Sequence, residues 1–172
     1  AFKEYESALV GVQKTNNELV GPELDKFKAQ IDEITSIKPL PVKDLLNVAE
    51  LGGQLNVGKE YLTEFSTVIN ELGITTDLNN ESAALKLAQF ANVMDMNQDS
   101  WRNLGNVVTE LGNNTATTEE TIIDFSHRLM GAGATIGMTE ANVLGLSAAM
   151  GAAGLKVEAG GTNLSKTLLQ IE

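Results

Sequence analysis

The same 22-residue pattern occurs three times along this chain: residues 52–73 read GGQLNVGKEYLTEFSTVINELG, residues 91–112 read ANVMDMNQDSWRNLGNVVTELG, and residues 133–154 read GATIGMTEANVLGLSAAMGAAG. Each copy begins with a small residue, carries bulky apolar residues three and five positions later, continues as an amphipathic run and ends in Gly. The copies start 39 and 42 residues apart. A period in this range is typical of one supersecondary unit stacked on copies of itself. It favours a scaffold or a binding surface over a catalytic pocket.

The segment before the repeats predicts a helical region that ends at two prolines. Pro22 stands at a favoured first helical position. The apolar residues that follow it are spaced as on one face of a helix: Leu24, Phe27, Ile31 and Ile34. Pro39 and Pro41 end this helix, because the residue before a proline is steered away from α geometry. We therefore predict residues 1–41 as an N-terminal helical segment with a proline-containing linker, and residues 42–172 as a helical-repeat domain, a fragment of a longer protein.

Helix start and stop signals continue to the end of the chain. We expect Gly73, Gly112 and Gly154 to end the helices of the three copies. We also expect a capping box between Thr117 and Glu120, and a last helix that starts near Gly161. The predicted fold class is all-α, with repeated helical hairpins that form a compact helical bundle or a short solenoid. Equivalent apolar positions in the three copies predict a shared buried core, made of Leu62, Phe65, Val68, Trp101, Leu104, Val108, Val143, Leu146 and Met150.

Composition restricts the class of partner. The chain is 42% apolar and 20% charged, an ordinary globular balance. It contains no cysteine, which excludes a disulfide framework and thiolate metal sites. The chain contains 12 Lys and Arg and 23 Asp and Glu, which gives a net charge of −11. Specific nucleic-acid binding relies on cations that neutralise phosphates, so we expect none here. No apolar run reaches the 18 residues of a membrane-spanning helix.

One acidic segment resembles the opening of a calcium loop. Asp95, Asn97 and Asp99 have the spacing of the first three ligands. The turn glycine of such a loop is replaced by Ser100, and the bidentate twelfth position is Asn106 rather than Glu. We therefore interpret Asn97 as a helix cap with acids at the helix start, where the macrodipole favours them.

The remaining candidates for chemistry also have structural interpretations. His127 has Asp124 three residues before it, as a base and its orienting carboxylate would, but no nucleophile or metal ligand can be identified by spacing. Trp101 is either a partner anchor or core, and its repeat position, shared with Leu62 and Val143, favours core. The many glycines suit helix caps and close helix contacts. We assign no catalytic, cofactor-binding or metal residue and predict that the chain is not an enzyme and uses no cofactor.

The third copy and its flanks resemble a known family. The segments that carry the resemblance are residues 129–141 (LMGAGATIGMTEA), 144–149 (LGLSAA) and 158–162 (EAGGT), with support from residues 71–78 (ELGITTDL) and 110–114 (ELGNN). They make the chain from about residue 45 to residue 172 similar to the conserved minor-tail domain of phage tail tape-measure proteins.

The resemblance implies a structural phage protein: a tail tape measure that determines tail length during assembly and is ejected ahead of the DNA at infection. The implied partners are the tail tube protein, tail assembly chaperones and tail tip or baseplate hub proteins. The implied location is the virion, in the lumen or tip of the tail tube, and the host cytoplasm during assembly. The alternative is a helical-repeat protein–protein interaction module of a non-phage scaffold, which the sequence flanking this fragment would distinguish. Contact of residues 141–155 with the host membrane during ejection stays open.

The resemblance also implies self-association, with three or six copies around the axis of a six-fold tail. The sequence offers a seam for it in the Gly131–Gly137 turn and residues 141–155, whose small side chains allow close backbone approach. Like charges oppose this assembly, so we expect association to strengthen as salt screens the net charge of −11.

Overall fold

The computed structural model describes residues 2–76 and 78–170, without the side chain of Phe2. Residues 171 and 172, the end of the predicted second domain, lie outside the described residues. The described elements are α1 (Phe2–Thr15), α2 (Pro22–Ile37), α3 (Val42–Gln54), α4 (Leu62–Thr75), α5 (Asn80–Val93), the 3-10 turn η1 (Gln98–Ser100), α6 (Trp101–Asn114), α7 (Glu119–Thr135), α8 (Glu140–Ala152) and α9 (Val157–Leu168). The fold is 77% helical, with no strand in the described ranges, which confirms the all-α class.

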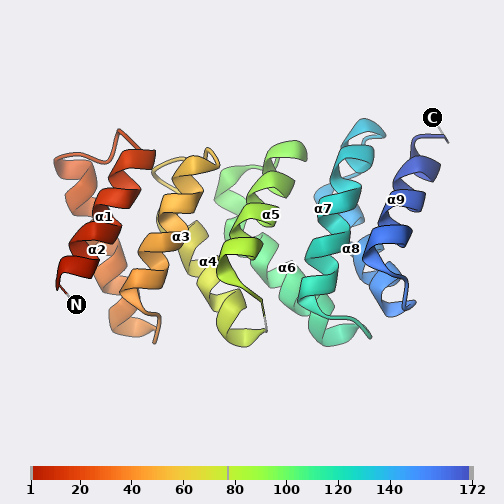
Figure 1. Cartoon of the computed structure of the whole chain (residues 1–172), viewed down its shortest axis with the longest axis horizontal. Coiled ribbons are helices and arrows are strands. Elements are labelled where there is room, and N and C mark those ends of the chain that lie inside the picture. The colour runs from red at the N-terminus through yellow and green to blue at the C-terminus, as the bar shows by residue number, and fades with distance from the viewer. Residues whose placement is uncertain (1, 77, 171–172) are drawn as a thin grey trace.

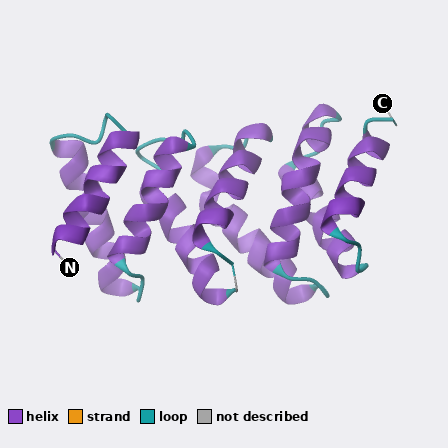
Figure 2. Cartoon of the chain, viewed as in Figure 1, coloured by secondary structure: helices purple, strands orange, loops and turns teal. Residues whose placement is uncertain are grey.

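The helices alternate between two layers (Figure 1). The odd-numbered helices pack in the order α1, α3, α5, α7 and α9, and the even-numbered helices α2, α4, α6 and α8 pack in the same order behind them. Loops cross between the layers at the top and bottom edges of the stack (Figure 2), and the two termini lie at its opposite ends. Each helix is thus stacked on the one two positions before it. This is the short solenoid of the sequence prediction.

The N-terminal hairpin continues this stack. α1 packs along α3, and α2 contacts both α3 and α4. Phe27 and Ile31 of α2 are buried in the same hydrophobic core as the repeats. Pro41 serves as the N-cap of α3, where it turns the chain from one hairpin into the next. The division of the chain into residues 1–41 and 42–172 stays a prediction.

The helix ends at which the three copies begin share one geometry. The amide N–H groups of Val57, Met96 and Met138 donate to the carbonyl oxygens of Gly52, Ala91 and Gly133, each at 2.9 Å. The residues just before these amides have positive φ: 62° at Asn56, 54° at Asp95 and 73° at Gly137. This combination is the Schellman motif, in which a residue in the left-handed conformation ends a helix.

The small residue that opens each copy makes room for the next helix. A Cβ atom on Gly52 would lie 2.9 Å from Cδ1 of Phe65, and one on Gly133 would lie 2.7 Å from Cγ2 of Val143. In the second copy this position is Ala91, which is also buried. The repeat pattern therefore describes a tight turn followed by a close contact between the end of one helix and the start of the next.

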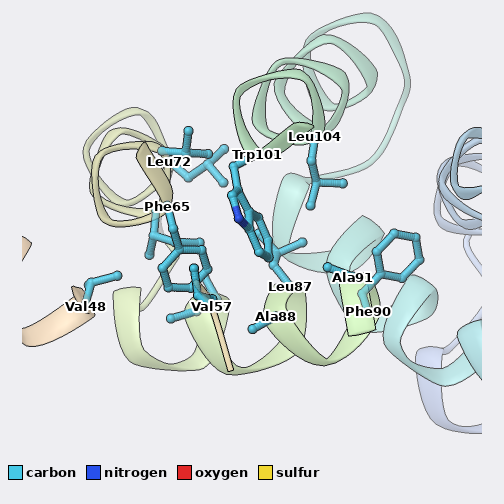
Figure 3. Packing of buried hydrophobic residues seen from close by; sticks show 14 of the residues in the cluster. Val48, Val57, Phe65, Leu72, Leu87, Ala88, Phe90, Ala91, Trp101 and Leu104 are labelled. Atoms are coloured by element: carbon cyan, nitrogen blue, oxygen red, sulfur yellow. The ribbon is translucent and has the colours of Figure 1, made fainter. Parts of the chain in front are cut away.

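The predicted shared core is present. Eight of its nine residues are buried, and Leu146 is half-buried against the same core. Trp101 is 2% exposed, and its ring meets that of Phe65 edge to face, with centroids 4.7 Å apart (Figure 3). The sequence favoured core over partner anchor for Trp101, and the structure places it in the core.

Two of the three predicted terminal glycines do not end helices. Gly73 lies inside α4 and Gly112 lies inside α6. A Cβ atom at Gly73 would lie 1.7 Å from Oδ1 of Asn80, and one at Gly112 would lie 2.4 Å from Cδ of Glu119. These two glycines therefore leave space for the first residue of the following helix. Only the third of them, Gly154, follows a helix end with a positive φ, of 72°.

Two further helix starts differ from the prediction. Thr118 caps α7, its Oγ1 accepting from the Thr121 N–H at 3.2 Å, whereas Thr117 was expected. Thr117 is instead held close to α8, since a Cβ atom on Gly151 would lie 2.2 Å from its Oγ1. α9 begins at Val157 rather than near Gly161. Gly161 lies inside this helix, where the lack of a side chain lets α9 approach α7.

Candidate functional site

The segment that resembles a calcium loop is a connection between helices. Asp95 holds the left-handed position that ends α5. The Asn97 side chain accepts from the Asp99 N–H at 3.4 Å and thereby caps the 3-10 turn that leads into α6. Asn97 is thus a cap, as interpreted, although of η1 rather than directly of α6. Among the described residues, no three His, Asp or Glu side chains are grouped so that they could hold a metal ion.

His127 belongs to a polar contact between α5 and α7. Its Nε2 lies 2.7 Å from Oε1 of Gln89, and one helical turn away Lys86 forms an ion pair with Asp124. Burial, followed by the positive charges of Lys86 and Arg128, holds the pKa of His127 below its usual value, and Asp124 opposes this shift. The His127 contact is therefore a polar link between the neighbouring helices α5 and α7.

A second polar cluster joins three even-numbered helices. Glu71 of α4 forms ion pairs with Lys38, just after α2, and with Arg102 of α6. The Arg102 Nε also lies 3.8 Å from Oε1 of Glu64. Burial alone would raise the pKa of Glu71, but hydrogen bonds and charges from Lys38 and Arg102 outweigh it and hold that pKa below its usual value.

Sequence reasoning missed this cluster because its members are 31 and 33 residues apart. A repeat of about 39 residues, in which each helix meets the one two positions later, is the signal that could have paired them. Like the contact at His127, the cluster ties neighbouring repeats together and contains no pairing of nucleophile and base.

The predicted seam lies at the C-terminal end of the stack and is exposed. Gly131 and Gly145 lie inside helices, and a Cβ atom added at either position would meet no atom within 4 Å. Ala149, Ala152 and Ala153 are exposed on α8, and Leu155 beyond it is 49% exposed. These small residues are presented to solvent, whereas Gly133 and Gly151 of the same seam pack within the chain against Val143 and Thr117.

A groove adjoins this surface where α6 and α8 begin. It has a volume of about 260 Å³, an apolar lining that includes Leu104, Val107 and Leu144, and the polar residues Asn103 and Glu140 around it. Such a lining suits an apolar side chain of a partner better than a reaction. The features of the described surface are therefore those of a scaffold with contact faces.

The comparison that decides the family is a match to its sequence model. Residues 29–172 match the model of the phage-related minor tail protein family. The chain belongs to this family. The match runs from the middle of α2 through α9 and includes all three copies of the repeat. No curated protein and no solved structure matches the chain.

Membership in the phage-related minor tail protein family indicates what kind of partner the exposed faces contact. The family supports a structural role in a phage tail, a place in the virion and contact with other tail components. It also indicates a structural rather than an enzymatic protein. None of the described helices is both long and apolar enough to cross a membrane.

Proposed function

We propose that this phage-related minor tail protein is a tail tape measure, which sets tail length during assembly and leaves the tail ahead of the DNA at infection. The observation that carries the proposal is the family match over residues 29–172, together with the resemblance of residues 129–141 and 158–162 to tape-measure proteins. The same match favours a phage tail over a non-phage scaffold.

The charge of the chain supports a place in the tail lumen. A net charge of −11 prevents adhesion to DNA, since like charges repel within a Debye length of about 8 Å at physiological salt. The protein can therefore share a narrow tube with DNA and leave before it. The solenoid is also elongated and presents long faces to the tube wall.

The proposed partners follow from this place. The tail tube protein, tail assembly chaperones and tail tip or baseplate hub proteins contact the chain during assembly, and three or six copies of the chain surround the tail axis. The exposed residues of α8 and of the Gly131–Gly137 turn support self-association, because small side chains allow backbones to approach closely. No catalytic residue, cofactor or metal enters the proposal.

Loss of the gene for this protein tests the proposal. In a phage or prophage that lacks it, electron microscopy of lysates should show no tails, or tubes of irregular length. Supply of the wild-type protein in trans should restore tails of one length, and mass spectrometry of purified virions should detect it. Tails of normal, uniform length without the protein would overturn the tape-measure function.

A further inference from the structure

The groove where α6 and α8 begin has a counterpart one repeat earlier, where α4 and α6 begin. α4 packs on α6 as α6 packs on α8, and residues 52–73, 91–112 and 133–154 align without gaps. Each residue that lines the groove therefore has an equivalent in the earlier junction. Ser100 corresponds to Tyr61, and Glu140 corresponds to Gln98. The chain itself thus shows what the same place holds when it is filled.

The junction between α4 and α6 is filled by its own side chains. A Cβ atom on Gly58 would lie 3.2 Å from Cδ2 of Tyr61 and 3.5 Å from Oε1 of Gln98, so both side chains lie against this glycine. Gln98 accepts from the Gly58 N–H at 2.7 Å and donates to the Asn56 carbonyl at 3.3 Å. These residues come from the segments just before α4 and α6. The comparison of the two junctions therefore does not depend on what adjoins α8.

The groove lacks both of these side chains. Where Tyr61 carries a ring, Ser100 carries only a hydroxymethyl group. Glu140 replaces Gln98, and its side chain forms no hydrogen bond or ion pair within the described part of the chain. What results is a hollow of about 260 Å³ with an unpaired carboxylate beside it. An apolar cavity of roughly 150 Å³ already accepts benzene, so the groove has room for an aromatic ring.

The lining of the groove is also more apolar than its counterpart. Leu144 lines it at the repeat position of Arg102, and Met96 lines it at the position of Val57. A methionine side chain adapts its shape to a ligand, and its sulfur makes favourable contacts with aromatic rings. The lining therefore suits a ring that is supplied from outside the chain.

The charges around the groove are negative. Glu140 lines it, and Asp95 and Asp99 are exposed in the segment that leads into α6. Arg102, the basic residue of α6, is already engaged by Glu71 of α4. A lysine or arginine next to the ring of a partner complements this edge, whereas an acidic neighbour is repelled. Aromatic residues and arginine are also the groups that most often anchor protein interfaces.

A second copy of the chain does not offer such a ring on the surface that the structure describes. The described aromatic side chains are either buried or packed against the core: Phe27, Phe65, Phe90, Trp101 and Phe125 are buried, and Tyr5 and Tyr61 are half-buried. The occupant is therefore a different protein. Membership in the minor tail family indicates another tail component.

We propose that the groove between α6 and α8 is a docking site for an aromatic side chain of another tail component, with a lysine or arginine next to it. The ring takes the place that Tyr61 fills one repeat earlier and packs on Met96 and Leu144. The adjacent base pairs with Glu140. The inference goes beyond the tape-measure function, because it requires only contact with another tail component, which the family indicates.

Tyramine is a minimal probe of this site, because it joins a phenol ring to an ammonium group. In a heteronuclear NMR titration of the 172-residue chain, tyramine should shift the amide signals of residues 96–107 and 140–144, with the millimolar affinity expected of so small a ligand. Tyrosol, in which a hydroxyl replaces the ammonium, should shift the same signals with an affinity roughly two- to fivefold lower, the usual effect of an exposed ion pair. Glu140→Gln should lower the affinity for tyramine to that for tyrosol.

Ser100→Tyr is the matched variant, because it fills the groove with the residue found one repeat earlier. It should weaken tyramine binding by about tenfold or more, since the ring loses its buried surface, with unchanged helicity by circular dichroism. Ser36→Tyr, at an exposed serine near the end of α2, is the control and should bind like wild type. No shift at any soluble tyramine concentration, shifts spread over the acidic surface, or wild-type binding by Ser100→Tyr would overturn the docking site.

Photo-cross-linking in assembled tails tests the identity of the partner. Benzoylphenylalanine at Asn106, an exposed residue of α6 next to Val107 of the groove, should cross-link to another tail protein. The linked segment should contain an aromatic residue beside a lysine or arginine, and Ser100→Tyr should suppress the product. Cross-links to a second copy of the chain, or a yield no higher than from Ala29 in α2, would overturn this partner. Neither experiment measures tail length, so their failure would leave the tape-measure function untouched.

Discussion

Replacement of Trp101 tests the shared core most sharply. The indole lies between α4 and α5 (Figure 3), is 2% exposed and stacks edge to face on Phe65 at 4.7 Å. Its Nε1 has no hydrogen-bond partner among the described residues, so the side chain stabilises the fold through burial and ring contact alone. Trp101→Ala therefore removes a large apolar volume and no hydrogen bond.

The expected loss follows from this burial. Truncation of a buried Trp to Ala typically lowers the free energy of unfolding by about 3–5 kcal/mol. Nε1 is already unsatisfied, so no hydrogen-bond loss adds to this value. For a chain of this size each kcal/mol shifts the melting temperature by roughly 2–4 °C, so Trp101→Ala should melt roughly 6–20 °C below wild type.

Urea denaturation followed by circular dichroism at 222 nm measures this effect, with Trp101→Phe as the control. Phenylalanine keeps an aromatic ring against Phe65 and removes the unpaired nitrogen, so it should lose well under half as much stability. An unchanged free energy of unfolding in Trp101→Ala would refute the buried placement. Equal losses in both variants would show that ring contact with Phe65 is not what the indole contributes.

Two other predictions concern single residues. Gly133→Ala should lower the free energy of unfolding by about 1–3 kcal/mol through overpacking. Gly145→Ala should instead raise it by up to about 1 kcal/mol through helix propensity. Equal effects of the two substitutions in urea denaturation would contradict the close contact at Gly133 and the open space at Gly145. Burial and the nearby cations lower the pKa of His127 below 6.5, so the folded state binds its proton less readily than the unfolded state. The free energy of unfolding should then fall as the pH drops through and below about 6.5. His127→Gln should remove this part of the pH dependence. Identical plots of the free energy of unfolding against pH for wild type and His127→Gln would refute the prediction.

The sequence predicted the helices because their signals are local. The three copies carry small, apolar and amphipathic positions at matching offsets, and these determine the turn at Gly52 and its contact with Phe65 in the same way as at Gly133 and Val143. The class and the core were therefore accessible from spacing alone. The ends of α4 and α6 were not, because Gly73 and Gly112 respond to the next helix rather than to their own.

Contacts between repeats were harder to predict. The ion pairs of Glu71 depend on how closely neighbouring even-numbered helices approach, which no local pattern encodes. The surface at α8 was partly accessible, since its small residues suggested a seam. That Gly145 faces open space required the arrangement of the layers.

The length of the tail is the measurement that tests the central claim most directly. A helical segment of 60 alanine-rich residues would be inserted after residue 170 in the gene for this protein, outside the described helices, and tails would be measured by electron microscopy. An inserted segment that lies along the tube as one α-helix adds about 1.5 Å per residue, so the account predicts tails longer by about 90 Å, with as narrow a length distribution as wild type. Infectious particles whose tails keep the wild-type length would contradict the tape-measure function, although not the place of this protein in the tail.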